Sequence, residues 1–347
     1  MTGKVCVLLD ANSWFRERLL RSSMGAALIH MLLQRQWRIG LPESVEGETT
    51  QVLITEGLKA IEAVQRDTRL LEQLAGQSLG RNPLDEAVLR HGIEQRWQEL
   101  APVIEKLPLS MDVVRQALDR VIRGIPPSKQ SEQFRDCCVW EQAVQMAAQC
   151  EVHLVTSDKD FYEKRDFSEG LATELRDHAA KLSHPILLHR TVEDWVKSLE
   201  QAAPIGIEDE RDLAQKIAAY VEPELKKKAA ERNFELGRLA TFFLKSFPTN
   251  KPTAIAISYE LTYEMMDQNT PQQRSSATVT AYGDCALDPT TRTISDVRPD
   301  RETFSWIDEQ GIPQQNTNHY AYLGEIPTSA ASQPLGSPHA LLFSSPG

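Results

Sequence analysis

The sequence of 347 residues predicts an α/β protein with a parallel sheet sandwiched by helices, followed by a C-terminal α+β extension that contains a small antiparallel sheet. Short apolar segments closed by an acid alternate with segments of helical period through the first 200 residues, which is typical of parallel sheets. Beyond Pro252 the hydrophobic period changes to two, as in antiparallel strands. We therefore expect domains at 1–200 and 205–326. The tail at 327–347 is rich in Ser, Pro, Ala and Gly and is expected to be disordered.

The elements of the first domain follow from these patterns in chain order. Buried strands are expected at 4–10, 37–42, 151–157 and 185–189, and helices at 13–36, 136–149, 168–182 and 192–199. Residues 53–124 are expected to form a helical insertion, because three segments of helical period are separated there by Gly and Pro. Strand and helix alternate otherwise, so the sheet should be parallel.

The extension is expected to begin with a helix over 207–246, either in one piece or in two pieces hinged near Pro223. Short strands separated by Gly, Pro, Asn and Asp are expected after it, at 253–263, 277–282, 292–294, 303–307 and 319–323.

Composition and charge limit the classes of function. No apolar run reaches the roughly 20 residues of a membrane span, and the N-terminus lacks the cleavage site of a signal peptide. The 5 cysteines are irregularly spaced, which argues against disulfides and structural zinc. We expect a cytoplasmic protein with no membrane partner. The net charge of −11 argues against binding nucleic acid through a broad basic surface, so such binding would need local basic residues or metal ions.

Acidic residues stand where the predicted strands end and where the next helices begin. Asp10 and Asp158 close two strands, Asp136 starts a helix, and Glu48 lies in the first turns of another. Ligands of open parallel sheets bind beyond the carboxyl ends of the strands, so these four carboxylates can meet at one edge. Carboxylates packed together repel each other unless a cation neutralises them, and Mg²⁺ and Mn²⁺ prefer such ligands. The chemistry favoured is metal-dependent phosphodiester hydrolysis.

Four motifs in this order carry a resemblance to a known family. They are Val7-Leu-Leu-Asp10-Ala-Asn12, Leu41-Pro42-Glu-Ser-Val45-Glu-Gly-Glu48, Arg135-Asp136-Cys-Cys-Val-Trp-Glu141 and Leu154-Val-Thr156-Ser-Asp158-Lys-Asp160-Phe161. Over residues 1–200 the chain resembles the PIN-domain nucleases. It is most similar to the larger bacterial PIN-like proteins, in which the third acid begins an Asp-Cys-Cys-like helix.

The resemblance implies a role for each matching residue. Asp10, Glu48, Asp136 and Asp158 resemble the metal ligands, with Mg²⁺ or Mn²⁺ as cofactor, and Asp160 resembles an accessory catalytic acid. Asn12, Thr156 and Ser157 resemble the polar residues that orient the site. Glu43 and Glu46 compete with Glu48 for the second position, which the family spacing gives to Glu48.

Several residues have a less specific interpretation. Arg16, Arg18, Lys159 and the run Lys226, Lys227 and Lys228 are candidates for binding nucleic acid, but they equally suit solvated surfaces. Cys137 and Cys138 are expected to be small buried hydrophobic residues, Glu141 to be solvated, and His153 to be structural. Residues 251–347 hold 5 Lys and Arg against 11 Asp and Glu, which suggests a protein-contact module that forms a homo-oligomer or binds a regulatory protein.

Three functions remain open at this level. The first is a metal-dependent endoribonuclease that cleaves single-stranded RNA, with a toxin or defence role by family analogy. The second is a catalytically inactive PIN-like module that binds RNA or protein. The third is a PIN-like DNA nuclease that acts on flaps or single strands.

Overall fold

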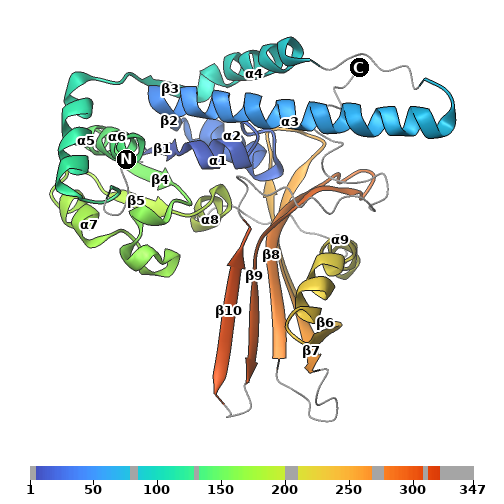
Figure 1. Ribbon diagram of the computed structural model, residues 1–347. Coiled ribbons are helices and arrows are strands. Elements are labelled where there is room, and N and C mark those ends of the chain that lie inside the picture. Colours follow the sequence, from blue (N-terminus) through green and yellow to red (C-terminus); the bar gives the residue numbers. More distant parts are fainter. Residues whose placement is uncertain are drawn as a thin grey trace. The chain divides into compact units, whose positions relative to one another are not determined.

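The computed structural model describes residues 5–78, 85–128, 133–199, 210–267, 277–307 and 312–320. Its contacts divide the chain into two compact units. The first unit contains residues 1–19 and 31–195, and the second contains residues 20–30 and 196–347 (Figure 1). The tail predicted at 327–347 lies outside the described residues.

The first unit is built on a parallel sheet of five strands in the order β3-β2-β1-β4-β5. The strands are β1 (Val5–Leu9), β2 (Arg38–Pro42), β3 (Ile104–Leu107), β4 (Glu151–Val155) and β5 (Ile186–His189). The central strand β1 is buried along its whole length, as expected for a strand covered on both faces. The predicted parallel sheet is therefore confirmed.

Helices flank this sheet (Figure 1). They are α1 (Ala11–Arg16), α3 (Glu43–Ala75), α4 (Glu86–Leu100), α5 (Met111–Arg123), α6 (Phe134–Met146) and α7 (Thr173–Ala179). Of α2 (Ser23–Arg35) only residues 31–35 belong to this unit, and of α8 (Val192–Ser198) only residues 192–195. Apolar side chains of these helices complete the core of the unit, and Trp14, Trp140 and Trp195 are 0% exposed. Large aromatic side chains of this kind contribute much of the burial energy of a core.

The prediction of helix throughout 53–124 was wrong at one place. Residues 104–107 form β3, which pairs in parallel with β2 and makes an edge of the sheet. The segment is only four residues long, mixes one acid and one base with its apolar residues and has no period of its own, so the helical pattern around it hid the strand.

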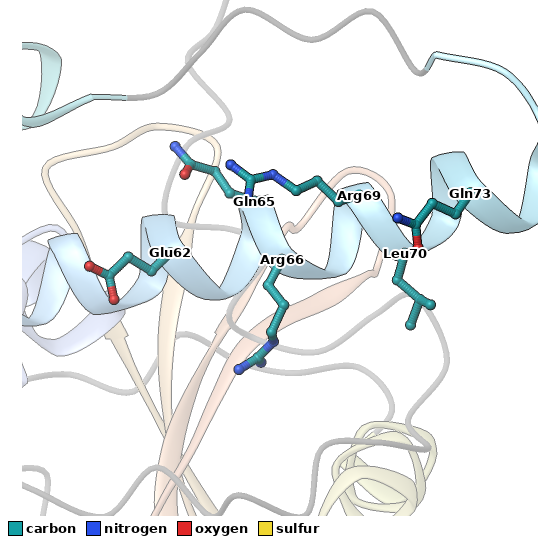
Figure 2. A pocket seen from close by; sticks show the side chains of 6 residues that line it. All are labelled: Glu62, Gln65, Arg66, Arg69, Leu70 and Gln73. Atoms are coloured by element: carbon teal, nitrogen blue, oxygen red, sulfur yellow. The ribbon is translucent and has the colours of Figure 1, made fainter.

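Helix α3 is 33 residues long and much of its second half is exposed. Figure 2 shows a hollow on it lined by Glu62, Gln65, Arg66, Arg69, Leu70 and Gln73. Every lining side chain comes from this one helix. A surface formed by a single helix encloses no ligand, so we assign no site to it.

The second unit is an antiparallel sheet of five strands in the order β10-β9-β8-β7-β6 with one long helix packed against it. The elements are α9 (Glu210–Ala230), β6 (Phe234–Pro248), β7 (Ile255–Asp267), β8 (Ala277–Leu287), β9 (Ile294–Ile307) and β10 (Pro313–His319). The small antiparallel sheet is thus confirmed. No helix of the described part of the chain has the length and apolar character needed to cross a membrane.

The helix predicted over 207–246 was wrong in its second half. Helix α9 continues through Pro223 without a break and ends at Ala230, and β6 begins at Phe234. Two β-bulges in β6, near Leu236 and Leu239, shift its alternation. They removed the period of two that would have identified a strand.

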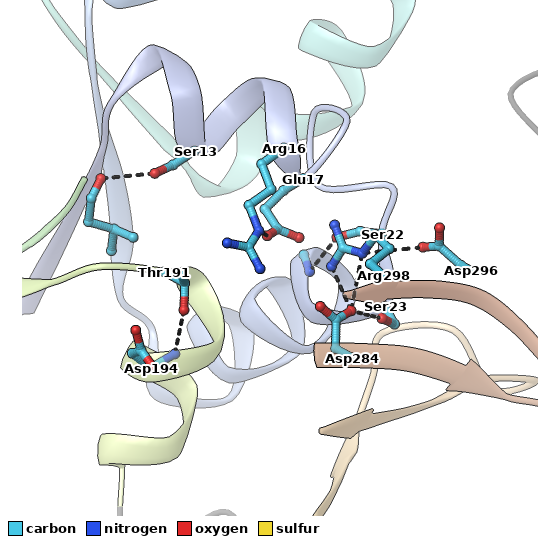
Figure 3. Close-up of polar contacts among 12 residues, drawn as sticks. Ser13, Arg16, Glu17, Ser22, Ser23, Thr191, Asp194, Asp284, Asp296 and Arg298 are labelled. Atoms are coloured by element: carbon cyan, nitrogen blue, oxygen red, sulfur yellow. Dashed lines mark hydrogen bonds and ion pairs between the residues drawn. The ribbon is translucent and has the colours of Figure 1, made fainter. Parts of the chain in front are cut away.

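The second unit also contains a buried ion pair. Arg298 donates to Asp284 at 2.6 Å, and both side chains are at most 3% exposed. Ser23, at the start of α2, donates to the same carboxylate at 2.8 Å (Figure 3). Residues 20–30 therefore pack with this unit, although they precede β2 in the chain.

Candidate functional site

The carboxyl ends of β1 and β4 bring two of the predicted acids together. These strands pair in register with Leu9 opposite Val155, so that Asp10 lies beside Thr156. The backbone N–H of Asp10 donates to the carbonyl of Val155 at 3.1 Å and continues the ladder by one bond. Asp158 follows two residues after Thr156. The sheet alone thus places the first and fourth acids at one edge.

Asp10 is a buried carboxylate held on both oxygens. It caps α1, where Oδ1 accepts from the Ser13 N–H at 2.6 Å, and Oδ2 accepts from the Thr156 hydroxyl at 2.5 Å. Asp10 is only 7% exposed. Burial raises the pKa of Asp10 to about 6, against the lowering effect of the bonds from Ser13 and Thr156.

Thr156 connects the two acids. Its hydroxyl donates to Asp10 and accepts from the backbone N–H of Asp158 at 3.0 Å, and its carbonyl accepts from the Tyr162 hydroxyl at 2.8 Å. Thr156 is 0% exposed, so this arrangement is held in the core. Within the described ranges, the other two predicted orienting residues, Asn12 and Ser157, form no side-chain hydrogen bond to the acids.

Asp136 lies in the first turn of α6, within range of the charges of the other three acids. Burial raises the pKa of Asp136, and the charges of Asp158, Asp10 and Glu48 raise it further. Burial also raises the pKa of Asp158, while hydrogen bonding with Asp136 lowers it. Neighbouring carboxylates raise the pKa of a carboxyl group because a second negative charge is disfavoured next to the first. The four acids therefore act on one another electrostatically.

The three glutamates that competed for the second position have different surroundings. Glu43 accepts from the backbone N–H of Leu109 at 3.1 Å, and Glu46 forms an ion pair with Lys106. The charge of Glu48 helps to raise the pKa of Asp136. This charge effect favours Glu48 as the fourth member of the group, which we name the acidic rim: Asp10, Glu48, Asp136 and Asp158.

Asp160 has a different position from the acidic rim. Its Oδ2 accepts from Gln133 Nε2 at 2.7 Å and its Oδ1 forms an ion pair with Arg165, so both oxygens have protein partners. Its backbone N–H donates to Asp158 Oδ1 at 2.8 Å. Asp160 thereby connects the start of α6 to the loop that carries Asp158. These bonds suit a residue that positions the acids.

The residues that could hold a cation are also bonded to the protein itself. Within the described ranges, no three or more His, Cys, Asp or Glu side chains are arranged as a metal-binding cluster. Asp10 faces Ser13 and Thr156, and Glu48 pairs with Arg135 at 2.8 Å. The donor set nevertheless fits Mg²⁺ or Mn²⁺, because it consists of carboxylate oxygens whose mutual repulsion a cation would relieve.

The predicted basic residues are dispersed. Arg16 has a side chain that is 9% exposed and lies 3.7 Å from Glu17, so it is no surface contact for a polyanion. Arg18 is half-buried and Lys159 is exposed, directly after Asp158. The three lysines of α9 belong to the second unit. There, Lys226 pairs with Glu222 at 3.1 Å and Lys228 with the buried Glu302 at 2.8 Å, while Lys227 is exposed.

The other reactive side chains near these motifs are buried. Burial raises the pKa of Cys137 to about 12 and of Cys138 to about 11, so both thiols stay protonated at neutral pH. Glu141, expected to be solvated, is instead 6% exposed and forms an ion pair with Arg120. His153 is 4% exposed and bonds to His189 at 2.8 Å.

Sequence reasoning missed several residues of the site. The backbone N–H of Ser13 donates to the capping carboxylate of Asp10, and the Ser13 hydroxyl donates to the carbonyl of Val155 at 3.1 Å (Figure 3). Its spacing of three from Asp10 is the usual signal of a helix cap and was available. Gln133 and Arg165 contact Asp160, and no pattern marked them. Arg135 stands at the start of the third motif, but nothing in the sequence indicated its ion pair with Glu48.

Comparison with known proteins gives one match. Residues 7–161 match a family model described as a PIN domain. No curated protein and no solved structure matches the chain. The matched range begins within β1 and ends three residues after Asp158, so it spans every member of the acidic rim.

Proposed function

Residues 7–161 belong to the PIN-domain family, and on this premise we propose that the protein is a metal-dependent nuclease that hydrolyses phosphodiester bonds of single-stranded RNA. PIN domains are generally nucleases and typically use divalent metals such as Mg²⁺ or Mn²⁺. The observation that carries the proposal is the acidic rim, in which Thr156 bonds to both Asp10 and Asp158, and the charges of Asp10, Glu48 and Asp158 act on the carboxyl group of Asp136.

The protein's own residues prepare this site in two ways. Thr156 and Ser13 fix the carboxylate of Asp10, and Thr156 also fixes the backbone of Asp158. Asp160 and Gln133 hold the start of α6 against the Asp158 loop, so that Asp136 faces the other acids. Preorganised carboxylates of this kind lose little conformational entropy when they bind a cation, because the protein already holds them in position.

Four acids at this edge would hold the ions: Asp10, Glu48, Asp136 and Asp158. Bound there, Mg²⁺ or Mn²⁺ would supply an activated water and stabilise charge on the phosphodiester. The pKa of Asp10, raised to about 6, still leaves this carboxylate ionised at neutral pH. In this proposal the nucleophile is water, so hydrolysis needs no covalent intermediate on a side chain of the protein.

The direct test is cleavage of matched single-stranded RNA and DNA with Mn²⁺. We expect Asp10→Asn and Asp158→Asn to lose at least about 100-fold in rate, and EDTA to silence the wild type. Asp67→Asn, which changes an acid of α3 whose side chain is 68% exposed, is the matched control. Cleavage that persists in EDTA or in Asp10→Asn would contradict the proposal.

The same experiment separates the alternatives. Cleavage of DNA in preference to RNA would assign the chain to the DNA nucleases. No Mn²⁺ binding in calorimetry, together with no cleavage, would identify an inactive binding module. For the toxin or defence role we expect expression of the wild type, and not of Asp10→Asn, to arrest the growth of host cells.

We propose a separate role in self-association or protein contact for the second unit. Residues 251–347 carry 5 Lys and Arg against 11 Asp and Glu, which disfavours contact with phosphates. Sedimentation of the full chain should give a mass above one copy, or a shift on adding a binding protein. A monomer that captures no partner would remove this proposal.

A further inference from the structure

One aromatic ring of the first unit collects two cations. The Nζ of Lys159 lies 5.5 Å from the centroid of the Phe167 ring, and the Cζ of Arg190 lies 5.0 Å from the same centroid. Tyr162 packs edge-on against this ring, with centroids 4.9 Å apart and planes at 86°. Lys159 and Arg190 come from two separate segments of the chain, and we name these two side chains the cation pair on Phe167.

The cation pair lies beside the acidic rim. Lys159 follows Asp158 directly, and Arg190 follows the last residue of β5, whose carbonyl accepts from the backbone N–H of Thr156 at 2.9 Å. Tyr162, which packs on Phe167, donates its hydroxyl to the carbonyl of Thr156 at 2.8 Å. Thr156 in turn holds Asp10 and Asp158. A short chain of contacts thus joins the two groups.

The arrangement is unusual for cations that only solvate a surface. Two positive charges on one ring repel each other, and a cation–π contact at an exposed site returns only about 0.5–1 kcal/mol. Lys159 has no carboxylate within ion-pair distance in the described parts of the chain. By contrast, Lys164 of the same loop lies 3.5 Å from Glu169. Two gathered cations next to carboxylates that hold metal ions suit an anion of the substrate.

We propose that Lys159 and Arg190 form a subsite for a backbone phosphate of the nucleic-acid strand, next to the phosphate that is cleaved, and that Phe167 is the positioning residue that holds the two cations together. This inference rests on the proposed nuclease function and adds the place of strand binding. A single strand fits, because its backbone can bend from the acidic rim to the cation pair without a complementary strand. In the simplest competing explanation, the two contacts only stabilise the loop around Phe167.

Salt dependence of binding distinguishes these explanations. A fluorescent single-stranded RNA is titrated with the full-length protein by anisotropy at several salt concentrations, with Ca²⁺ replacing Mg²⁺ and strand integrity checked on a gel. For single strands, log K falls against log salt with a slope of about 0.7 for each phosphate contact. Lys159→Gln and Arg190→Gln should each reduce the slope, by up to about 0.7, and weaken binding up to about five-fold. Lys164→Gln is the matched control and should change neither.

The position of the phosphate is tested with strands that carry one neutral methylphosphonate linkage. At the linkage that the cation pair contacts, neutralisation should weaken binding by the wild type more than binding by Lys159→Gln, in which Arg190 alone remains to contact the phosphate. Equal losses in both proteins at every linkage would overturn the inference, as would salt slopes that do not differ among Lys159→Gln, Arg190→Gln and Lys164→Gln. Free phosphate that displaces the strand at millimolar concentration would also overturn it, because the site would then recognise an isolated anion.

The role of Phe167 has its own readout. Phe167→Leu keeps an apolar contact for Tyr162 but removes the ring, so it should weaken strand binding, and Phe167→Tyr should restore it. Equal binding by Phe167→Leu and the wild type would contradict the positioning role. Failure of the inference is distinguishable from failure of the nuclease proposal. Variants with unchanged salt slopes in a protein that cleaves refute the cation pair alone, whereas a wild type that neither binds nor cleaves any strand refutes both.

Discussion

The buried carboxyl group of Asp10 predicts a variant that gains stability while it loses activity. Burial raises its pKa from the usual 3.8 to about 6. A rise of this size means that ionisation costs the folded state about 3 kcal/mol more than the unfolded state. The folded state binds the proton more tightly, so this stability is present below about pH 4 and is lost as the pH rises through 6. In Asp10→Asn the penalty is absent at every pH.

The amide of Asp10→Asn has its own cost. Asp10 accepts from the Ser13 N–H and from the Thr156 hydroxyl, and an amide offers one oxygen where the carboxylate offers two. The lost acceptor should cost about 1 kcal/mol. In EDTA, the variant should therefore be about 2 kcal/mol more stable than the wild type at pH 8 and about 1 kcal/mol less stable at pH 4.

Urea unfolding followed by tryptophan fluorescence measures this crossover. Trp14, Trp37, Trp97, Trp140 and Trp195 belong to the first unit, so the signal reports mainly on the unit that contains Asp10. Asp67→Asn is the control, and its stability should follow that of the wild type at both pH values. A difference between Asp10→Asn and the wild type that is the same at pH 4 and pH 8 would refute the reasoning, because the effect would then owe nothing to ionisation.

Three further predictions follow from the same unit. Glu48→Gln should weaken Mn²⁺ binding in calorimetry at least about ten-fold, and Glu46→Gln should leave it unchanged; the reverse result would reassign the second acid. Burial lowers the pKa of His189 to about 4, so stability should fall by up to about 3 kcal/mol as the pH drops from 6.5 to 4. His189→Gln should remove that decrease, and an unaltered pH profile would count against it. Arg120→Ala should destabilise the unit by about 3 kcal/mol, because it leaves Glu141 charged and buried; a melting temperature equal to that of the wild type would contradict this.

The edge of the parallel sheet was predictable because two simple rules agree there. Short, largely apolar segments such as 5–9 and 151–155, each closed by an acid, favour buried strands, and the carboxyl ends of parallel strands meet on one side. Asp10 and Asp158 were therefore placed without any knowledge of contacts. The strand β3 was not, because four residues of mixed character between two helices carry too little pattern to decide.

Contacts made by irregular segments could not be predicted. The hydrogen bond from Gln133 to Asp160 joins the residue before α6 to a short 3₁₀ turn. Arg190 contacts the ring of Phe167, which lies 23 residues earlier in the sequence. Such pairs depend on where a loop runs, which the periodicity of the flanking strands does not determine. The contact of Lys159 with the ring of Phe167, eight residues away, likewise depends on the path of this loop.

The raised pKa values of the acidic rim bear on whether the site is active or vestigial. Asp10 and Asp136 are both disfavoured as charged groups in the folded protein without a cation, and their charges disfavour each other. A helix start or a strand end could use Ser or Asn there without that cost. A chain that retains several buried, mutually repelling carboxylates at one edge gives up stability that a bound cation would restore. An inactive module would lose the same stability without a bound cation to restore it. If the site does bind a cation, Mn²⁺ should raise the melting temperature of the wild type more at pH 8, where these carboxyl groups are more fully ionised, than at pH 5. A shift that is equal at both values would argue that the cation binds elsewhere.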